Sequence, residues 1–115
     1  MSNILTSIAL LLLSASCLAA DTKVTKADIV GTWCYYEVVI SGKPMESNDE
    51  YTFLENGEYS YKTPIGITGS DLWEIKDGFL LLGGPKKPKI ISLVNDTLTL
   101  EAVVGTLKFR KSSCN

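Results

Sequence analysis

The 115-residue sequence contains no histidine. Histidine is the side chain that most often serves as a general base near neutral pH, and it is the commonest ligand of transition metals. Its absence excludes nucleophiles of the Ser-His and Cys-His kind. Two acidic pairs remain, Glu55 with Glu58 and Glu74 with Asp77. Both flank predicted tight turns, whereas a hydrolase needs one buried carboxyl group. We therefore expect no enzymatic activity, no cofactor and no metal site.

A strong charge of one sign is also missing, since 11 basic and 13 acidic residues give a net charge of −2. This balance excludes the basic footprint of a nucleic-acid-binding protein and the polybasic patch of a membrane-binding one. A small basic cluster, Lys86, Lys87 and Lys89, lies near two prolines at a predicted hairpin tip. It fits either a solvated turn or a site for a protein partner. We expect the protein to be a monomer.

Long apolar runs are absent except near the start, where residues 8–13 are all apolar and small residues follow up to Ala20. The run is too short to span a bilayer and is typical of a signal peptide over residues 1–20. An exported domain, periplasmic or secreted, would then occupy residues 21–115. Alternatively, residues 14–17 form a degenerate lipobox, and Cys17 would become a lipidated N-terminus at the outer membrane. Membrane contact is expected only in that second case.

Cysteine is scarce, with three residues in all. Cys17 belongs to the predicted signal region, so Cys34 and Cys114 remain for the domain. Two cysteines in a small exported domain predict a disulfide, here closing a loop of about 80 residues. The alternative is a pair of free buried thiols.

The mature chain is rich in strand signals and poor in helix signals. Thr25 and Asp28 have the spacing of a helix start, but Gly31 limits that helix to about one turn. Turn dipeptides at residues 56–57, 77–78 and 95–96 separate short alternating runs. We predict eight strands and a polar loop over residues 41–50. The predicted strands are residues 29–40, 51–55, 58–62, 71–76, 79–82, 89–94, 97–104 and 106–111.

Short strands with tight connections predict an all-β fold, a small up-and-down antiparallel barrel with one N-terminal helical turn. A β-sandwich is the competing architecture. In such a barrel the first and last strands pair. That pairing would bring Cys34 next to Cys114.

Several motifs together resemble one known family. Gly31-x-Trp33 opens the first strand after the helical turn, Phe53-x-x-Asn56-Gly57-x-Tyr59 and Trp73-x-Ile75-x-Asp77-Gly78 follow, and residues 96–100 read Asp-Thr-Leu-Thr-Leu. This order resembles the short bacterial lipocalin-like domains. The resemblance implies that Trp33 closes one end of the barrel. It also implies that Arg110 stacks as a cation over the indole.

Strand alternation places six aromatic side chains inside the predicted barrel. They either line a pocket for a small hydrophobic ligand or fill a narrow barrel by close packing. The predicted loop over residues 43–50 would act as a lid over the pocket or be a solvated loop. The six aromatic residues are Trp33, Tyr35, Phe53, Tyr59, Tyr61 and Trp73.

Two functions follow from the sequence. The first is an exported, lipocalin-like binding protein for a small hydrophobic ligand. The alternative is a protein-interaction module, such as a periplasmic enzyme inhibitor or immunity protein, that uses residues 41–50 and the basic tip.

Overall fold

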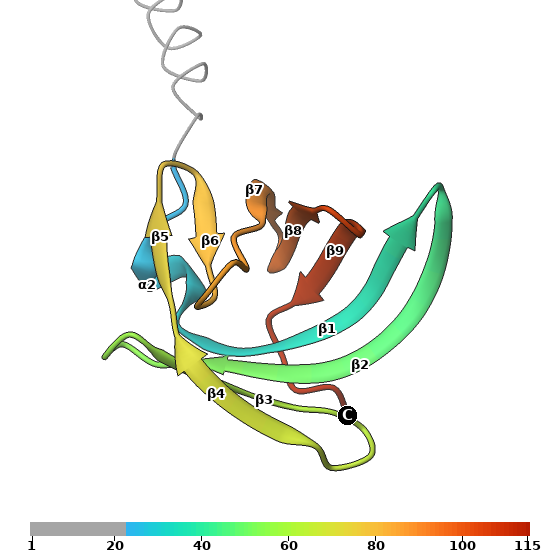
Figure 1. Ribbon diagram of the computed structural model, residues 1–115, viewed down its shortest axis with the longest axis horizontal. Coiled ribbons are helices and arrows are strands. Elements are labelled where there is room, and N and C mark those ends of the chain that lie inside the picture. Colours follow the sequence, from blue (N-terminus) through green and yellow to red (C-terminus); the bar gives the residue numbers. More distant parts are fainter. Residues whose placement is uncertain (1–22) are drawn as a thin grey trace, which may run out of the picture.

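The computed structural model describes residues 23–115, so the predicted signal peptide and Cys17 lie outside the described residues. One short helix precedes nine antiparallel strands that curl into a nearly closed barrel (Figure 1). This confirms the all-β barrel prediction. The elements are α2 (Lys26–Ile29), β1 (Gly31–Ile40), β2 (Lys43–Phe53), β3 (Glu58–Lys62), β4 (Thr68–Leu72), β5 (Glu74–Lys76), β6 (Phe79–Leu81), β7 (Lys89–Val94), β8 (Thr97–Ala102) and β9 (Gly105–Arg110).

The strands follow the order β4-β3-β2-β1-β9-β8-β7-β6-β5. As predicted, the first strand pairs with the last, and Cys34 lies opposite Arg110. The two edges of the sheet, β4 and β5, are consecutive in the chain and meet at Trp73. The barrel is therefore interrupted between β4 and β5, where the backbone turns from one edge to the other.

Trp73 explains why there are nine strands rather than eight. The predicted strand 71–76 divides at this residue, whose backbone N–H donates to the carbonyl oxygen of Gly57 (2.8 Å). Its indole turns into the core, and its Nε1 donates to the carbonyl oxygen of Leu54 (2.9 Å). Burying this large ring therefore takes the chain out of the ladder for one residue.

The prediction of a loop over residues 41–50 is wrong. Ser41 and Gly42 alone form the turn, with φ values of 51° and 79°, and Ile40 already pairs with Lys43. Positive φ at both central residues is the signature of a two-residue hairpin turn. The first half of β2 is largely exposed on both faces, so its sequence lacks the apolar alternation of a half-buried strand. Its polar composition therefore led to the prediction of a loop.

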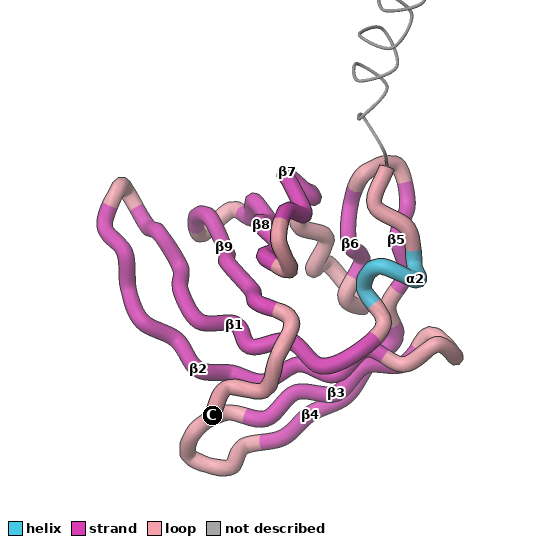
Figure 2. The backbone as a smooth tube through the Cα atoms, turned by 180° about the vertical axis from the view of Figure 1, so that it is seen from behind, coloured by secondary structure: helices cyan, strands magenta, loops and turns pink. Residues whose placement is uncertain are grey.

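The predicted helical turn is confirmed and lies beside β5 at one end of the barrel (Figure 2). The backbone N–H of Thr25 donates to the carboxylate of Asp28 (2.8 Å), and the Thr25 hydroxyl does the same (3.0 Å). These two hydrogen bonds lower the pKa of Asp28. After one turn the helix ends, and β1 begins at Gly31, which has a φ of 130°.

Trp33 is fully buried beside this turn, and its Nε1 donates to the carbonyl oxygen of Ile29 (2.7 Å). The predicted stacking of Arg110 on Trp33 is wrong. Phe109 points into the core, so strand alternation turns Arg110 outward, where its guanidinium lies 4.5 Å from the ring centroid of Tyr36. Lys111 follows the end of β9, and its Nζ lies 5.5 Å from the Trp33 ring centroid.

The predicted disulfide between Cys34 and Cys114 is present, with the two Cα atoms 4.8 Å apart. Cys34 is fully buried on the face of β1 opposite the barrel interior. The backbone N–H of Cys114 also donates to the carboxylate of Glu50 (3.1 Å). The C-terminus is thereby tied to β1 and β2.

Candidate functional site

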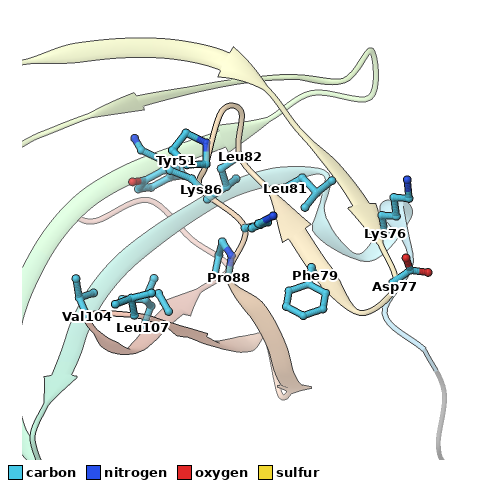
Figure 3. Close-up of a pocket in the computed structure, with 14 residues that line it drawn as sticks. Tyr51, Lys76, Asp77, Phe79, Leu81, Leu82, Lys86, Pro88, Val104 and Leu107 are labelled. Atoms are coloured by element: carbon cyan, nitrogen blue, oxygen red, sulfur yellow. The ribbon is translucent and has the colours of Figure 1, made fainter.

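A cavity of about 890 Å³ opens on one side of the barrel (Figure 3). Its volume lies in the range of pockets that hold small organic molecules, about 300–1,000 Å³. Most of the side chains around it are apolar. The lining residues are Tyr51, Lys76, Asp77, Phe79, Leu81, Leu82, Pro85, Lys86, Lys87, Pro88, Ala102, Val103, Val104 and Leu107.

The cavity exists because β6 and β7 barely pair. Only Phe79 and Lys89 are in register, and the chain between the two strands leaves the sheet as a loop, residues 82–88. The loop is held by its own hydrogen bonds, from the N–H of Leu82 to the carbonyl oxygen of Lys86 (2.8 Å) and from Leu80 to Pro88 (2.9 Å). The cavity thus lies between this loop, the β5–β6 hairpin and the β8–β9 hairpin, with Tyr51 contributed from β2.

Tyr51 joins the cavity to the aromatic core behind it. Its ring centroid lies 5.5 Å from that of Phe109, 5.8 Å from that of Tyr61 and 6.0 Å from that of Tyr59. Such distances are those of interacting aromatic pairs. The ring therefore packs on core side chains and also lines the cavity.

The six aromatic residues predicted for the pocket lie behind this wall, and none of them lines the cavity. Trp33, Phe53, Tyr59 and Trp73 are buried in the core, whereas Tyr35 and Tyr61 are half-buried and pack against it. The close-packing interpretation describes them better, because the barrel interior at their level is filled by the rings themselves. Sequence reasoning missed Tyr51, although it shares a face of β2 with Phe53 two positions away.

The rim of the cavity carries three cationic groups and one anionic group, Lys76, Lys86, Lys87 and Asp77. Figure 3 shows Lys76 and Asp77 at one end, and Lys86 at the other end with Tyr51. Within residues 23–115, Lys108 and Glu37 form an ion pair, with 3.3 Å between Nζ and Oε2. Neither residue lines the cavity. Lys86 and Lys87 are therefore exposed charges with no carboxylate of the described chain bound to them.

Apart from the four charged residues of the rim, the polar side chain that lines the cavity is the phenol of Tyr51. Burial raises its pKa above the ordinary range, and the nearby charges of Asp49 and other tyrosines add to the shift. Within residues 23–115 its hydroxyl makes no hydrogen bond. It stays protonated at neutral pH and can donate to a molecule in the cavity.

Asp49 lies on the same face of β2 as Tyr51, and it is the partner of Tyr35 in the β1–β2 register. It does not line the cavity. Burial raises its pKa, because the carboxylate loses part of its hydration. The described residues 23–115 contain no cluster of three acidic or cysteine side chains that could hold a metal ion.

No protein-family model matches the chain, and no curated protein is similar to it in sequence. Solved structures do share its fold. A lipocalin-like protein from Bacteroides uniformis superposes with a TM-score of 0.61 at 18% identity, over 74% of this chain and 99% of that one. An uncharacterized protein from Bacteroides eggerthii gives a TM-score of 0.59 at 16% identity, over 73% and 99%.

Within residues 23–115, no helix has the length and apolar character needed to cross a bilayer. The barrel, the one-turn helix under Trp33 and these structural similarities lead to one conclusion. The described domain has a lipocalin-like fold.

Proposed function

We propose that this domain is an exported, non-enzymatic binding protein that holds a small hydrophobic ligand. The observation that supports it is the cavity of about 890 Å³ with a mostly apolar wall. Binding against such a wall contributes about 25 cal/mol of favourable free energy for each Å² of apolar surface removed from water. A ligand burying about 300 Å² of apolar surface would gain about 7 kcal/mol before the costs of association.

The cavity can be tested with Nile red, a neutral dye whose emission rises in apolar surroundings. We expect saturable binding by the folded protein. Ala102→Trp should weaken the binding, because Ala102 lines the cavity and an indole would occupy part of it. Glu101→Trp is the matched control, since this neighbour on β8 is exposed and does not line the cavity. Equal binding by both variants, or no binding by the parent, would contradict the proposal.

Export is the second part of the proposal. A disulfide between Cys34 and Cys114 is what an oxidising compartment stabilises. The intact mass of the protein recovered from the cell envelope or the medium tests this and locates the mature N-terminus. A chain starting at Asp21 indicates a soluble product, whereas a much heavier chain starting at Cys17 indicates a lipidated one. An uncleaved chain that stays in the cytoplasm would contradict export.

The alternative function is a protein-interaction module, a role that would keep the barrel as a scaffold. Residues 43–50 are strand rather than loop, so in this alternative the basic tip and the exposed turns would carry the contacts. Val103 and Val104 are exposed at the β8–β9 turn, a position suited to contact with a partner. If Nile red does not bind, this alternative becomes the better explanation. In either role we propose that the protein acts as a monomer.

A further inference from the structure

The charges around the cavity are unlike those of the chain as a whole. The whole sequence is slightly acidic, with 13 acidic and 11 basic residues, whereas the cavity rim has three lysines against one aspartate. Asp77 follows Lys76 directly, and both lie at one end of the cavity (Figure 3). The cationic excess is therefore concentrated on Lys86 and Lys87.

These two lysines are held at the cavity by the loop that carries them. Pro85 and Pro88 flank them, Pro88 is buried, and the carbonyl oxygen of Lys86 accepts a hydrogen bond from Leu82 (2.8 Å). The loop backbone is fixed while the ammonium groups are exposed to solvent. A bound anion would meet both charges with little ordering of the backbone.

A third polar group, the phenol of Tyr51, lies at the same end of the cavity as Lys86 (Figure 3). Tyr51 lines the cavity, and its hydroxyl has no hydrogen-bond partner within residues 23–115. A neutral phenol donates to a carboxylate or phosphate and does not repel it. Leu81, Phe79 and Leu107 offer apolar contacts along the wall. Lys76 and Asp77 lie at the opposite end from Lys86 (Figure 3).

We infer that the ligand is an anionic amphiphile, with its acidic head at Lys86, Lys87 and Tyr51 and its apolar tail along Leu81 and Leu107. This inference rests on the proposed function, because it concerns the same cavity. A neutral hydrophobic molecule would leave the phenol without a partner. A cationic one would face two like charges.

The experiment displaces Nile red with three probes that share a ten-carbon tail, decanoate, decanol and decyltrimethylammonium, below the concentrations at which they form micelles. We expect decanoate to displace the dye at a concentration roughly tenfold lower than decanol does, and decyltrimethylammonium to be the weakest. Equal displacement by all three would overturn the anionic inference and leave the apolar pocket intact. Failure of all three together with failure of Nile red to bind would reject the pocket itself.

A charge-matched pair of variants assigns the preference to the two lysines. Lys86→Gln/Lys87→Gln should bring the decanoate-to-decanol ratio close to one. The ratio is compared within each protein, so a change in dye affinity cancels. Lys43→Gln/Lys62→Gln removes two exposed charges that do not line the cavity, and it should keep the parent ratio. An unchanged ratio in the first variant would overturn the assignment, even if the preference for decanoate exists. Circular dichroism of each variant confirms that it is folded.

Discussion

The hydroxyl of Tyr59 on β3 donates a buried hydrogen bond to the carbonyl oxygen of Leu82, 2.8 Å away and 23 residues later in the chain. Leu82 directly follows β6. The bond therefore connects the two sides of the interruption between β4 and β5, where no strand ladder does so within residues 23–115. Asp71 on β4 lies close to Gly83 in the same region, near enough that a Cβ on Gly83 would collide with its carboxylate.

Removing this hydroxyl should weaken the barrel at its interruption. Tyr59→Phe keeps the ring but leaves a buried carbonyl oxygen without its donor, a loss of about 1–2 kcal/mol in the free energy of unfolding. Urea unfolding measures the change. Tyr61→Phe, on the same strand and face, is the control, and it should change stability by less than about 0.5 kcal/mol because its hydroxyl makes no hydrogen bond within residues 23–115. Equal losses in the two variants would show that the Tyr59 bond contributes nothing specific.

The disulfide should contribute a large share of the stability. Its cysteines are 80 residues apart, and closing a loop of that length in the unfolded chain corresponds to about 4–5 kcal/mol in the chain-entropy treatment. Cys34→Ala/Cys114→Ala should lower the free energy of unfolding by an amount of that order. Urea unfolding of the parent with and without a reductant provides an independent check. A midpoint unchanged by either treatment would contradict this expectation.

The raised pKa of Asp49 predicts how stability depends on pH. Its carboxyl group binds a proton more tightly in the folded state than in the unfolded state, because burial disfavours the charge. The resulting penalty is absent below the unfolded pKa of about 3.9 and is complete once pH exceeds the folded pKa. Asp49→Asn should therefore stabilise the protein at about pH 7 and have no such effect at about pH 3.

Urea midpoints at the two pH values test the prediction for Asp49. Asp96→Asn removes a negative charge from an exposed turn, so it reports the effect of net charge alone. A similar gain in both variants would assign the effect to net charge. A loss of stability in Asp49→Asn at neutral pH would contradict the prediction outright.

Gly105 should tolerate no side chain. It starts β9 with a φ of 152°, and a Cβ there would collide with the backbone carbonyl oxygen of Val39. Gly105→Ala should cost about 3 kcal/mol or more, since the clash is with backbone. Gly42→Ala is the matched control, because its φ is also positive but nothing lies within 4 Å, and it should cost only about 1–2 kcal/mol. Thermal unfolding compares the two, and equal losses would show that the close approach to β1 is unimportant.

Much of the fold could be predicted from local signals. Asp77 and Gly78 form the expected turn with φ values of 53° and 82°, and Asn95 and Asp96 do the same with 51° and 60°. These dipeptides favour positive φ and so fix the hairpin registers. The pairing of β1 with β9 and the disulfide followed from the count of strands and cysteines.

Other features depend on tertiary contacts that no local pattern contains. The contact of Lys111 with Trp33 requires β9 to end at Arg110, which alternation along the strand does not specify. The place of the cavity depends on where β6 and β7 stop pairing, and that is set by the loop over residues 82–88. Sequence reasoning therefore found the aromatic residues and left open whether they line a pocket or fill the barrel, and the structure has them filling it. The wall of the cavity is built largely from hairpin ends.

The pairing of β1 with β9 also has a consequence for how the chain folds. The first strand of the domain finds one of its two neighbours only when the last strand is available, so its ladder cannot be completed while the chain is still being synthesised. Contacts between such distant segments give a high contact order, and proteins of this kind fold in milliseconds to seconds rather than microseconds. A chain that is kept unfolded until it has left the cytoplasm would lose nothing by the delay, since the barrel can close only after its final residues have arrived.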